Sequence, residues 1–499
     1  MTGTTALLPG DDLARLRAAL SAADFTATGV AARIGPEAAA AVNRGDHRAA
    51  LRATAGGTPL DTLVRLYVCG QAVPADAAGA AVPVAPLLAG GLLVADGGAV
   101  RAGVDLEPYG DGCWVVADLP AAARPRGAGT ALPADHVLGV GGASRMLGAA
   151  TVRHPVASAL DLGTGCGIQA LDLARHAARV TATDVSARAL RFAATTAALS
   201  GQSWELLPGD LARPVAGRRF DLVVSNPPFV VGPGAGTHAY RDSGRAGDAV
   251  CAQLAAAAPG LLTEGGTMQF LANWAHVRGE DWADRVAGWV EGAGLDAWVV
   301  QREVSDPLSY ARLWLADAGQ EHDPHLLAAW LDWYDAHRIE AVGFGLVNLR
   351  RTDAAPVVRV EDLRQPVEGR WGDHVAAWWA RQDWLRGRDA EGLLRTRYRT
   401  APELRLEQSA ARGADGWAVD RQLLALHGGL GRREEVDPVL VALVGGCDGT
   451  ATVADQLAVL AAAYDVPAAA LAGVAGPVLA RLVERGVLVP VEGDVVGAA

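Results

Sequence analysis

Two short stretches between residues 160 and 231 carry groups that could bind a ligand together. The first is the glycine turn Gly163-Thr164-Gly165-Cys166-Gly167, which follows an apolar run. Such a turn lets the backbone approach a ligand closely and presents amide groups at the start of a helix. A short strand, Thr181-Ala182-Thr183, ends at Asp184, 21 residues after Gly163, where a carboxylate usually accepts hydrogen bonds from ribose hydroxyls. The spacing indicates a nucleoside-containing ligand.

The spacing of the glycines argues against NAD. The dinucleotide fingerprint is Gly-x-Gly-x-x-Gly, but here the third glycine comes early, at Gly167, and Ile168 follows it. A lone glycine turn also serves in many proteins only to pack a helix against a strand. The second stretch is therefore needed to choose between a ligand site and a packing turn.

That second stretch is Asn226-Pro227-Pro228-Phe229, directly after the apolar run that begins at Phe220. Two consecutive prolines end a strand and fix the local backbone. A rigid loop of this kind would hold the Asn226 amide and the Ser225 and Pro227 carbonyls as acceptors for a substrate –NH2 group. Phe229 offers a face to a planar substrate. The alternative is a plain turn with a half-buried phenylalanine.

These residues need a parallel sheet to bring them together. Apolar runs and helical patterns alternate through this region, as in a doubly wound sheet, whose ligands bind at the carboxyl ends of the strands. We expect strands near residues 158–162, 179–183, 203–207, 220–225, 266–272, 296–303 and 341–350.

The motifs together resemble class I S-adenosylmethionine (SAM) dependent methyltransferases of the Asn-Pro-Pro-Phe/Tyr group, over roughly residues 129–351. That group includes amino-methyltransferases of adenine and guanine, and the HemK-like enzymes that methylate a glutamine amide in peptide release factors. The stretch Asn226 to Val231 is especially similar to the release-factor branch, although Phe229 stands where tyrosine is usual there. The resemblance implies a Rossmann-like, seven-stranded domain that uses SAM and no metal.

The resemblance also implies individual roles. Asn226, Pro227 and Phe229 would form the catalytic clamp on the acceptor nitrogen. In the family, an acid after the third strand meets the adenine amino group and the next apolar residue flanks the ring, which points to Asp210 and Leu211; on sequence alone, Asp210 could equally be a helix cap. The implied donor-binding set is Asp161, Gly163, Gly165, Gly167, Asp184, Asp210, Leu211 and Asn226.

Three further segments could reach the same site. The glycine-rich segment from His136 to Ser144 either lets the backbone approach the methionine end of SAM or forms a plain turn. His238, Tyr240, Arg241 and Asp242 lie in a segment interpreted as a mobile lid. An insertion at about 304–340 carries Trp314, Trp330, Trp333 and Tyr334, for which core packing is favoured over a substrate platform.

Outside the catalytic region we expect two mainly helical domains, giving boundaries at 1–128, 129–351 and 352–499. Asp11 to Ala23 is amphipathic, with Leu13, Leu16 and Leu20 on one face. Both terminal regions show helices that run into strands, a pattern typical of winged helices. Winged helices bind nucleic acid or serve as protein contacts.

Composition narrows the function classes. The chain has 499 residues and a formal net charge of −12, so it has no general attraction for nucleic acid. No membrane span or secretory signal is visible, and the five scattered cysteines fit a reducing cytoplasm.

The sequence therefore predicts a cytoplasmic SAM-dependent N-methyltransferase that acts on a planar amide or amine nitrogen. A protein glutamine side chain is the preferred acceptor. A nucleobase amine in RNA or DNA and a small molecule remain open, as does a SAM-binding, nucleic-acid-associated regulator without catalysis.

Overall fold

The computed structural model describes residues 4–110, 112–120, 132–234, 246–320, 322–414 and 416–491. Its contacts divide the chain into two compact units, residues 1–148 with 154–362, and residues 149–153 with 363–499. Within those described ranges no helix is long and apolar enough to cross a membrane. The positions expected to form the lid (His238, Tyr240, Arg241 and Asp242) lie outside the described residues.

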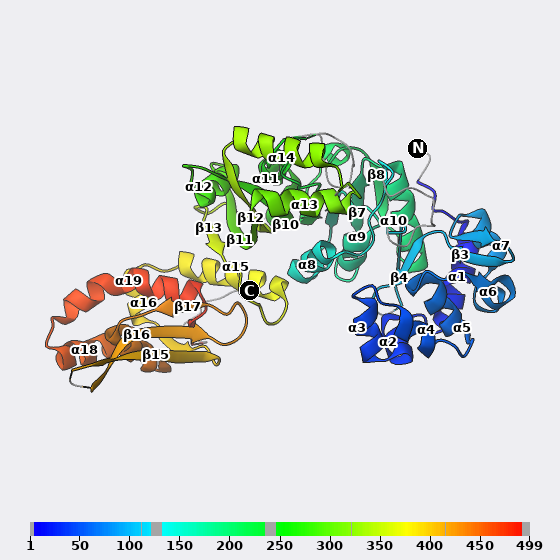
Figure 1. Cartoon of the computed structure of the whole chain (residues 1–499). Coiled ribbons are helices and arrows are strands. Elements are labelled where there is room, and N and C mark those ends of the chain that lie inside the picture. Colours follow the sequence, from blue (N-terminus) through cyan, green and yellow to red (C-terminus); the bar gives the residue numbers. More distant parts are fainter. Residues whose placement is uncertain are drawn as a thin grey trace. The chain divides into compact units, whose positions relative to one another are not determined.

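One mixed sheet organises the first unit (Figure 1). Across the described residues its eight strands run in the order β13-β11-β12-β10-β9-β6-β7-β8. Neighbours from β8 to β10 pair in parallel, whereas β12 lies antiparallel between β10 and β11. The strands are β6 (Ala159–Leu162), β7 (Val180–Asp184), β8 (Glu205–Pro208), β9 (Phe220–Ser225), β10 (Leu262–Val277), β11 (Leu295–Ser305), β12 (Ile339–Arg351) and β13 (Val358–Asp362).

All seven expected strands are present, which confirms the predicted fold class, and β13 is an addition. It pairs in parallel with β11 at the edge of the sheet. Its sequence, Val358-Arg359-Val360-Glu361-Asp362, mixes charges with valines because an edge strand is partly solvated, so it lacks the apolar run that marks the central strands. The expected boundary at residue 351 therefore falls inside this sheet, and the first unit continues to Asp362.

Helices connect and cover these strands. They are α8 (Gly142–Ala150), α9 (Ile168–Leu173), α10 (Ala187–Leu199), α11 (Ala249–Leu261), α12 (Trp282–Ala287), α13 (Pro307–Asp317) and α14 (Pro324–Ala336). The last two, formed by the predicted insertion, pack against each other and against β12. The insertion's aromatic residues belong to one hydrophobic cluster with Val231, in agreement with the favoured core packing; they are Tyr310, Trp314, Trp330, Trp333 and Tyr334.

The N-terminal region belongs to the same unit as the sheet. Its elements are α1 (Gly10–Ala22), α2 (Ala27–Ile34), α3 (Pro36–Val42), α4 (Arg48–Ala53), α5 (Pro59–Leu63), a short π-helix (Val64–Val68), β1 (Val73–Pro74), α6 (Ala75–Ala81), α7 (Val84–Ala89), β2 (Leu93–Asp96), β3 (Ala99–Ala102), β4 (Asp105–Pro108) and β5 (Trp114–Ala117). Leu13, Leu16 and Leu20 of α1 are buried, as their spacing predicts.

Hydrogen bonds join this region to α10. The backbone N–H of Trp114 donates to Ser200 Oγ at 3.1 Å, and that of Val116 donates to Thr196 Oγ1 at 3.1 Å. One hydrophobic core runs from α1 to Phe192 of α10. Residues 1–128, expected as a separate domain, therefore share their core with the catalytic sheet.

The order of elements from α5 to β3 is helix, strand, two helices and a hairpin, with β3 between β1 and β2, which is compatible with the expected winged helix. The second unit repeats helix, strand, two helices and strand in α17 (Pro438–Gly445), β18 (Asp448–Thr452), α18 (Val453–Tyr464), α19 (Ala468–Glu484) and β19 (Leu488–Pro490).

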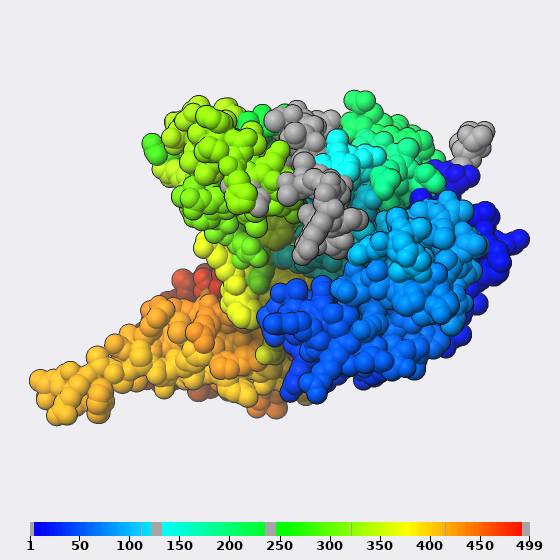
Figure 2. Space-filling model, turned by 45° about the vertical axis from the view of Figure 1, so that its right-hand side comes forward, coloured from blue at the N-terminus to red at the C-terminus, as the bar shows by residue number. Residues whose placement is uncertain are grey.

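The second unit also contains α15 (Trp371–Arg386), α16 (Ala390–Arg395), β14 (Arg397–Thr400) and the hairpin β15 (Leu404–Gly413) with β16 (Gly416–Leu426) and β17 (Arg433–Glu435). Figure 2 shows the hairpin as a narrow yellow-orange arm. Trp417, which pairs with Arg412 in this hairpin, is 74% exposed.

Candidate functional site

The glycine turn lies between β6 and α9, at the carboxyl end of a central strand. Gly163, Gly165 and Gly167 have φ values of 71°, 55° and 87°, which side chains rarely adopt. A Cβ at Gly163 or Gly165 would meet no described atom within 4 Å, whereas one at Gly167 would lie 2.8 Å from Trp204. The first two glycines therefore open space for a ligand, and the third allows the turn to pack against its neighbours.

Asp161 holds the turn together from inside. It is fully buried, and its Oδ2 accepts hydrogen bonds from Thr164 Oγ1 at 2.6 Å and from the Ala170 N–H at 3.0 Å. Burial raises the pKa of Asp161 to about 7, even though both hydrogen bonds favour the charged form. Asp161 does not line the cavity described below, so the structure gives it a supporting position under the turn.

Asp184 ends β7 and faces the same turn. Its Oδ2 accepts a hydrogen bond from the Gly165 N–H at 2.9 Å, and its Oδ1 accepts one from the Ser186 N–H at 2.8 Å. Burial raises the pKa of this carboxyl above its usual range, and the backbone hydrogen bonds counteract part of that rise. Each oxygen keeps a further lone pair, so the carboxylate can still accept bonds from a ligand.

Asp210 and Leu211 follow β8, the next strand along. Leu211 has a left-handed backbone, with φ of 46°, and its carbonyl accepts a hydrogen bond from Thr183 Oγ1 at 3.0 Å. A branched residue in this conformation is strained, and such residues concentrate at ligand sites. Tertiary contacts such as the hydrogen bond from Thr183 therefore hold this loop in a backbone conformation that leucine disfavours.

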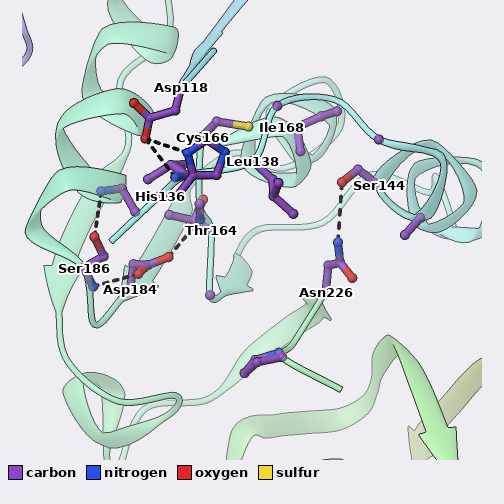
Figure 3. Close-up of a pocket in the computed structure, with 18 of the residues that line it drawn as sticks. Asp118, His136, Leu138, Ser144, Thr164, Cys166, Ile168, Asp184, Ser186 and Asn226 are labelled. Carbon is purple, nitrogen blue, oxygen red and sulfur yellow. Dashed lines mark hydrogen bonds and ion pairs between the residues drawn. The ribbon is translucent and has the colours of Figure 1, made fainter. Parts of the chain in front are cut away.

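Asn226 follows β9 and faces α8 across the site (Figure 3). Its Nδ2 donates to Ser144 Oγ at 3.4 Å, and Ser144 is 9% exposed. With its amide nitrogen turned toward Ser144, the Oδ1 atom of Asn226 is available to a substrate N–H. The backbone carbonyl of Ser144 accepts in turn from Gln169 Nε2 at 2.8 Å, which ties α8 to α9.

A cavity of about 840 Å³ joins these parts. That volume is within the usual range for small-molecule sites. The sequence-predicted residues that line it are Gly163, Gly165, Asp184, Asp210, Leu211 and Asn226. Asp161, Gly167, Pro227 and Phe229 are not among the described lining residues, although Pro228 is.

Phe229 lies beside the cavity in an aromatic group. Its ring centroid is 6.2 Å from that of Trp314, nearly edge-on at 74°, and 5.7 Å from that of Phe344. Trp314 itself lines the cavity. The aromatic surface closest to the site is therefore supplied by α13, and Phe229 supports it.

The N-terminal region contributes residues that sequence reasoning missed. Asp105 and Asp118 line the cavity, and Arg188 of α10 donates to both carboxylate oxygens of Asp118. Burial, with Glu107 nearby, raises the pKa of Asp105 to about 7. No motif marks these positions, because β4 and β5 reach the site through tertiary packing. The glycine-rich segment before Ser144 also lines the cavity, which favours the ligand-contact reading of it.

The described lining residues carry a clear electrostatic signature. Six of them are aspartates and none is an arginine; the six are Asp105, Asp118, Asp135, Asp184, Asp210 and Asp317. Arg188 neutralises one of these charges through its ion pair with Asp118, and the other lining aspartates make the cavity favour cations over phosphates.

Comparison with known proteins decides the family of the central segment. A family model described as "Methyltransferase small domain" matches residues 139–281. This segment is a class I methyltransferase domain. Domains of this class use SAM as the methyl donor. Two models described as domains of unknown function match the flanking regions, DUF7059 at residues 22–103 and DUF7782 at 376–490.

Curated relatives of the methyltransferase domain act on different acceptors. A "Ribosomal RNA small subunit methyltransferase C" from Alcanivorax borkumensis is 37% identical over 114 residues, 23% of this chain and 31% of that protein. A "Release factor glutamine methyltransferase" from Bordetella pertussis is 35% identical over 148 residues, 27% of this chain and 53% of that protein. A protein of the same name from Xylella fastidiosa is 48% identical over 73 residues, 14% of this chain and 26% of that one.

The chain thus spans about half or less of the length of these relatives. The predicted HemK-like resemblance is confirmed for the methyltransferase domain, and the acceptor is not fixed by it. The choice of acceptor must rest on the site itself.

Proposed function

We propose that the protein transfers the methyl group of SAM to a planar amide or amine nitrogen. One observation carries the proposal: a single cavity contains both the open glycine turn with Asp184 and the acceptor group Asn226. A cofactor sensor would need the first half of this cavity but not the second. This favours an enzyme over a SAM-binding regulator.

The lining suits the donor. SAM is cationic at its sulfonium and its ammonium, and the lining aspartates other than Asp118, which is paired with Arg188, provide the opposite charge. Asp184 would accept the ribose hydroxyls, while Asp210 and Leu211 would meet the adenine, as in the resembled family. Gly163 and Gly165 would let the methionine part approach the backbone, because a Cβ is absent where the turn faces open space.

The chain's own task in the reaction is to position the acceptor. The methyl group on the sulfonium is already activated, so placing a nitrogen in line with it accounts for much of the catalysis. The nitrogen lone pair forms the new N–C bond, the C–S electron pair stays on sulfur, and the nitrogen later releases a proton to water. A hydrogen bond from the substrate N–H to Asn226 Oδ1 strengthens as positive charge develops, so it favours the transition state.

We further propose a protein side-chain amide, such as glutamine, as the acceptor. The aspartate lining would repel the phosphates that a nucleic acid brings close to its bases. The release-factor relatives are named for a glutamine acceptor, which agrees with this choice. A nucleobase amine stays the alternative acceptor, because another relative is named for ribosomal RNA.

The same proposal places the enzyme in the cytoplasm. All five cysteines, which fall within the described ranges, are free, and four of them are buried. Thiols kept in this state fit a reducing compartment, where protein acceptors involved in translation are present.

Methyl label from radioactive SAM tests the proposal. Purified protein is incubated with a lysate from a strain that lacks the gene, and the product is treated separately with protease and with nuclease. We expect label that protease releases and nuclease leaves intact. Label lost on nuclease treatment alone would assign a nucleic acid instead, and SAM binding without any transfer would favour the regulator.

A further inference from the structure

The insertion between β11 and β12 brings two side chains into the cavity. Trp314 and Asp317 both lie on α13 and both line the cavity that contains Asn226. They are three residues apart, so they share one face of the helix. Among the described lining residues, Trp314 has the only large aromatic ring. This face of α13 is therefore a second wall of the site, distinct from the glycine turn and the strand ends.

Trp314 lies on the acceptor side of the cavity. Its ring contacts Phe229, the last residue of the Asn-Pro-Pro-Phe loop, with 6.2 Å between centroids. The near-perpendicular angle of 74° directs an edge of one ring to the other, and the Trp314 ring also packs on Tyr310 with 6.1 Å between centroids. Asp184 and Asp210 follow β7 and β8, at one edge of the sheet, whereas α13 follows β11, which lies near the other edge.

Helix α13 is fastened to the acceptor loop directly. The Tyr310 hydroxyl accepts a hydrogen bond from the Val231 N–H at 3.1 Å and also contacts the amide of Asn273. Asp306 caps the start of the helix by accepting from the Ser309 N–H at 3.0 Å. These anchors fix Trp314 relative to Asn226, because Val231 lies five residues beyond Asn226 in the same loop.

An aromatic face beside a carboxylate recognises a definite chemistry. A planar group stacks on the indole, and its N–H donors or a nearby positive charge interact with the carboxylate. A phosphate in the same place would meet the charge of Asp317, with Asp210 and Asp184 lining the same cavity. The pair thus suits an uncharged or cationic acceptor and disfavours an anionic one.

We propose that α13 forms the acceptor subsite, in which Trp314 stacks on the planar nitrogen-bearing group and Asp317 selects an acceptor without phosphate. The inference rests on the proposed methyl transfer and adds the residues that determine its specificity. It assigns a role to the insertion, whose tyrosines anchor it while Trp314 faces the substrate.

Paired substitutions at Trp314 separate a stacking role from a packing role. Trp314→Phe keeps an aromatic ring, whereas Trp314→Leu keeps apolar bulk without one. The acceptor is the nuclease-treated protein fraction of a lysate from a strain lacking the gene, titrated at saturating radioactive SAM. We expect Trp314→Leu to raise the apparent KM for this fraction about tenfold, and Trp314→Phe to raise it less than threefold. The dissociation constant of SAM, measured by calorimetry, should stay unchanged in both.

Asp317→Asn should raise the same KM severalfold, because the carboxylate that interacts with the N–H donors of the acceptor has been lost. The same substitution should strengthen inhibition by adenosine 5′-monophosphate, because the charge that repels its phosphate has been removed. Leu313→Ala is the matched control, since Leu313 is 61% exposed on α13 and does not line the cavity. Equal KM values for Trp314→Leu and Trp314→Phe would overturn the subsite. A wild-type protein that binds SAM but labels no acceptor would instead overturn the proposed function.

Discussion

The hydroxyl of Tyr334 donates a hydrogen bond of 2.9 Å to the backbone carbonyl of Val231, 103 residues away in sequence. The Tyr310 hydroxyl accepts from the N–H of the same residue, so both backbone groups of Val231 bond to tyrosines of the insertion. Val231 follows the acceptor loop closely and is fully buried. The insertion therefore fixes the exit of the loop that carries Asn226.

Tyr334→Phe should destabilise the first unit by about 1–3 kcal/mol, because it removes the hydrogen bond to a buried carbonyl and leaves the ring in place. Chemical denaturation followed by tryptophan fluorescence would measure the loss. Tyr464→Phe is the control, because Tyr464 is 47% exposed and its loss should change the free energy of unfolding by less than about 0.5 kcal/mol. Equal effects of the two substitutions would contradict the role given to Tyr334.

Asp184→Asn should weaken SAM binding by about 1.5–3 kcal/mol, because it replaces a charged acceptor of the ribose hydroxyls with a neutral one. Isothermal calorimetry measures the change directly. Asp332→Asn, at an exposed position of α14, serves as the charge-matched control and should leave the affinity unaltered. An Asp184→Asn protein with wild-type affinity would remove Asp184 from the donor site.

Asn226→Ala should lower kcat roughly a hundredfold with little change in SAM affinity, the size of effect seen when a preorganised polar group is lost from a transition-state contact. Steady-state transfer assays and calorimetry on the same sample give the two quantities. Turnover near the wild-type rate would show that the acceptor nitrogen is held by other groups.

Ser144 should act only through Asn226. Ser144→Ala removes the hydroxyl that accepts from Asn226 Nδ2, so we expect kcat to fall several-fold while SAM affinity holds. In an Asn226→Ala background the same substitution should have no further effect, because the amide that it orients is gone. Additive losses in this double-mutant cycle would assign Ser144 a separate role, and Ser144→Thr should restore part of the rate.

SAM affinity should rise between about pH 6 and pH 8. The pKa of Asp105 is raised by burial to about 7, and a cationic ligand favours the ionised carboxylate, so binding tightens as the pH passes that value. The folding stability of the ligand-free protein should change in the opposite direction. Because the pKa of Asp105 is raised in the folded state, its contribution to stability is fully present below the unfolded-state pKa of about 3.9, and it is lost as the pH rises through about 7. Asp105→Asn should flatten the pH dependence of SAM binding, measured by calorimetry.

The sequence predicted those parts of the site that local chemistry marks. Three features are visible in the sequence as residue types: the glycines that adopt positive φ, the carboxylate that follows one strand, and the two prolines that follow another strand. The central strands before them are recognisable by their apolar residues. Asp105 and Asp118 carry no such mark, because their place at the cavity depends on packing between elements distant in sequence. Trp314 stands out in sequence only as one of several aromatic residues of the insertion, for which core packing is favoured. The edge strand β13 was missed for a related reason, since half-solvated strands lack a continuous apolar run.

The core that runs from α1 to α10 has a thermodynamic consequence. Asp105 of β4 and Asp118, which follows β5, line the cavity, and β5 packs on α10. Donor binding and the folding of the N-terminal region are therefore linked equilibria. A ligand at a concentration about a hundred times its dissociation constant adds roughly 2.7 kcal/mol to the free energy of unfolding of the region that unfolds cooperatively with the binding site. That gain in stability extends to helices far from the cavity. By reciprocity, a substitution at a remote core position such as Phe25 would lower the apparent affinity for SAM if it increases the population in which the N-terminal region is unfolded.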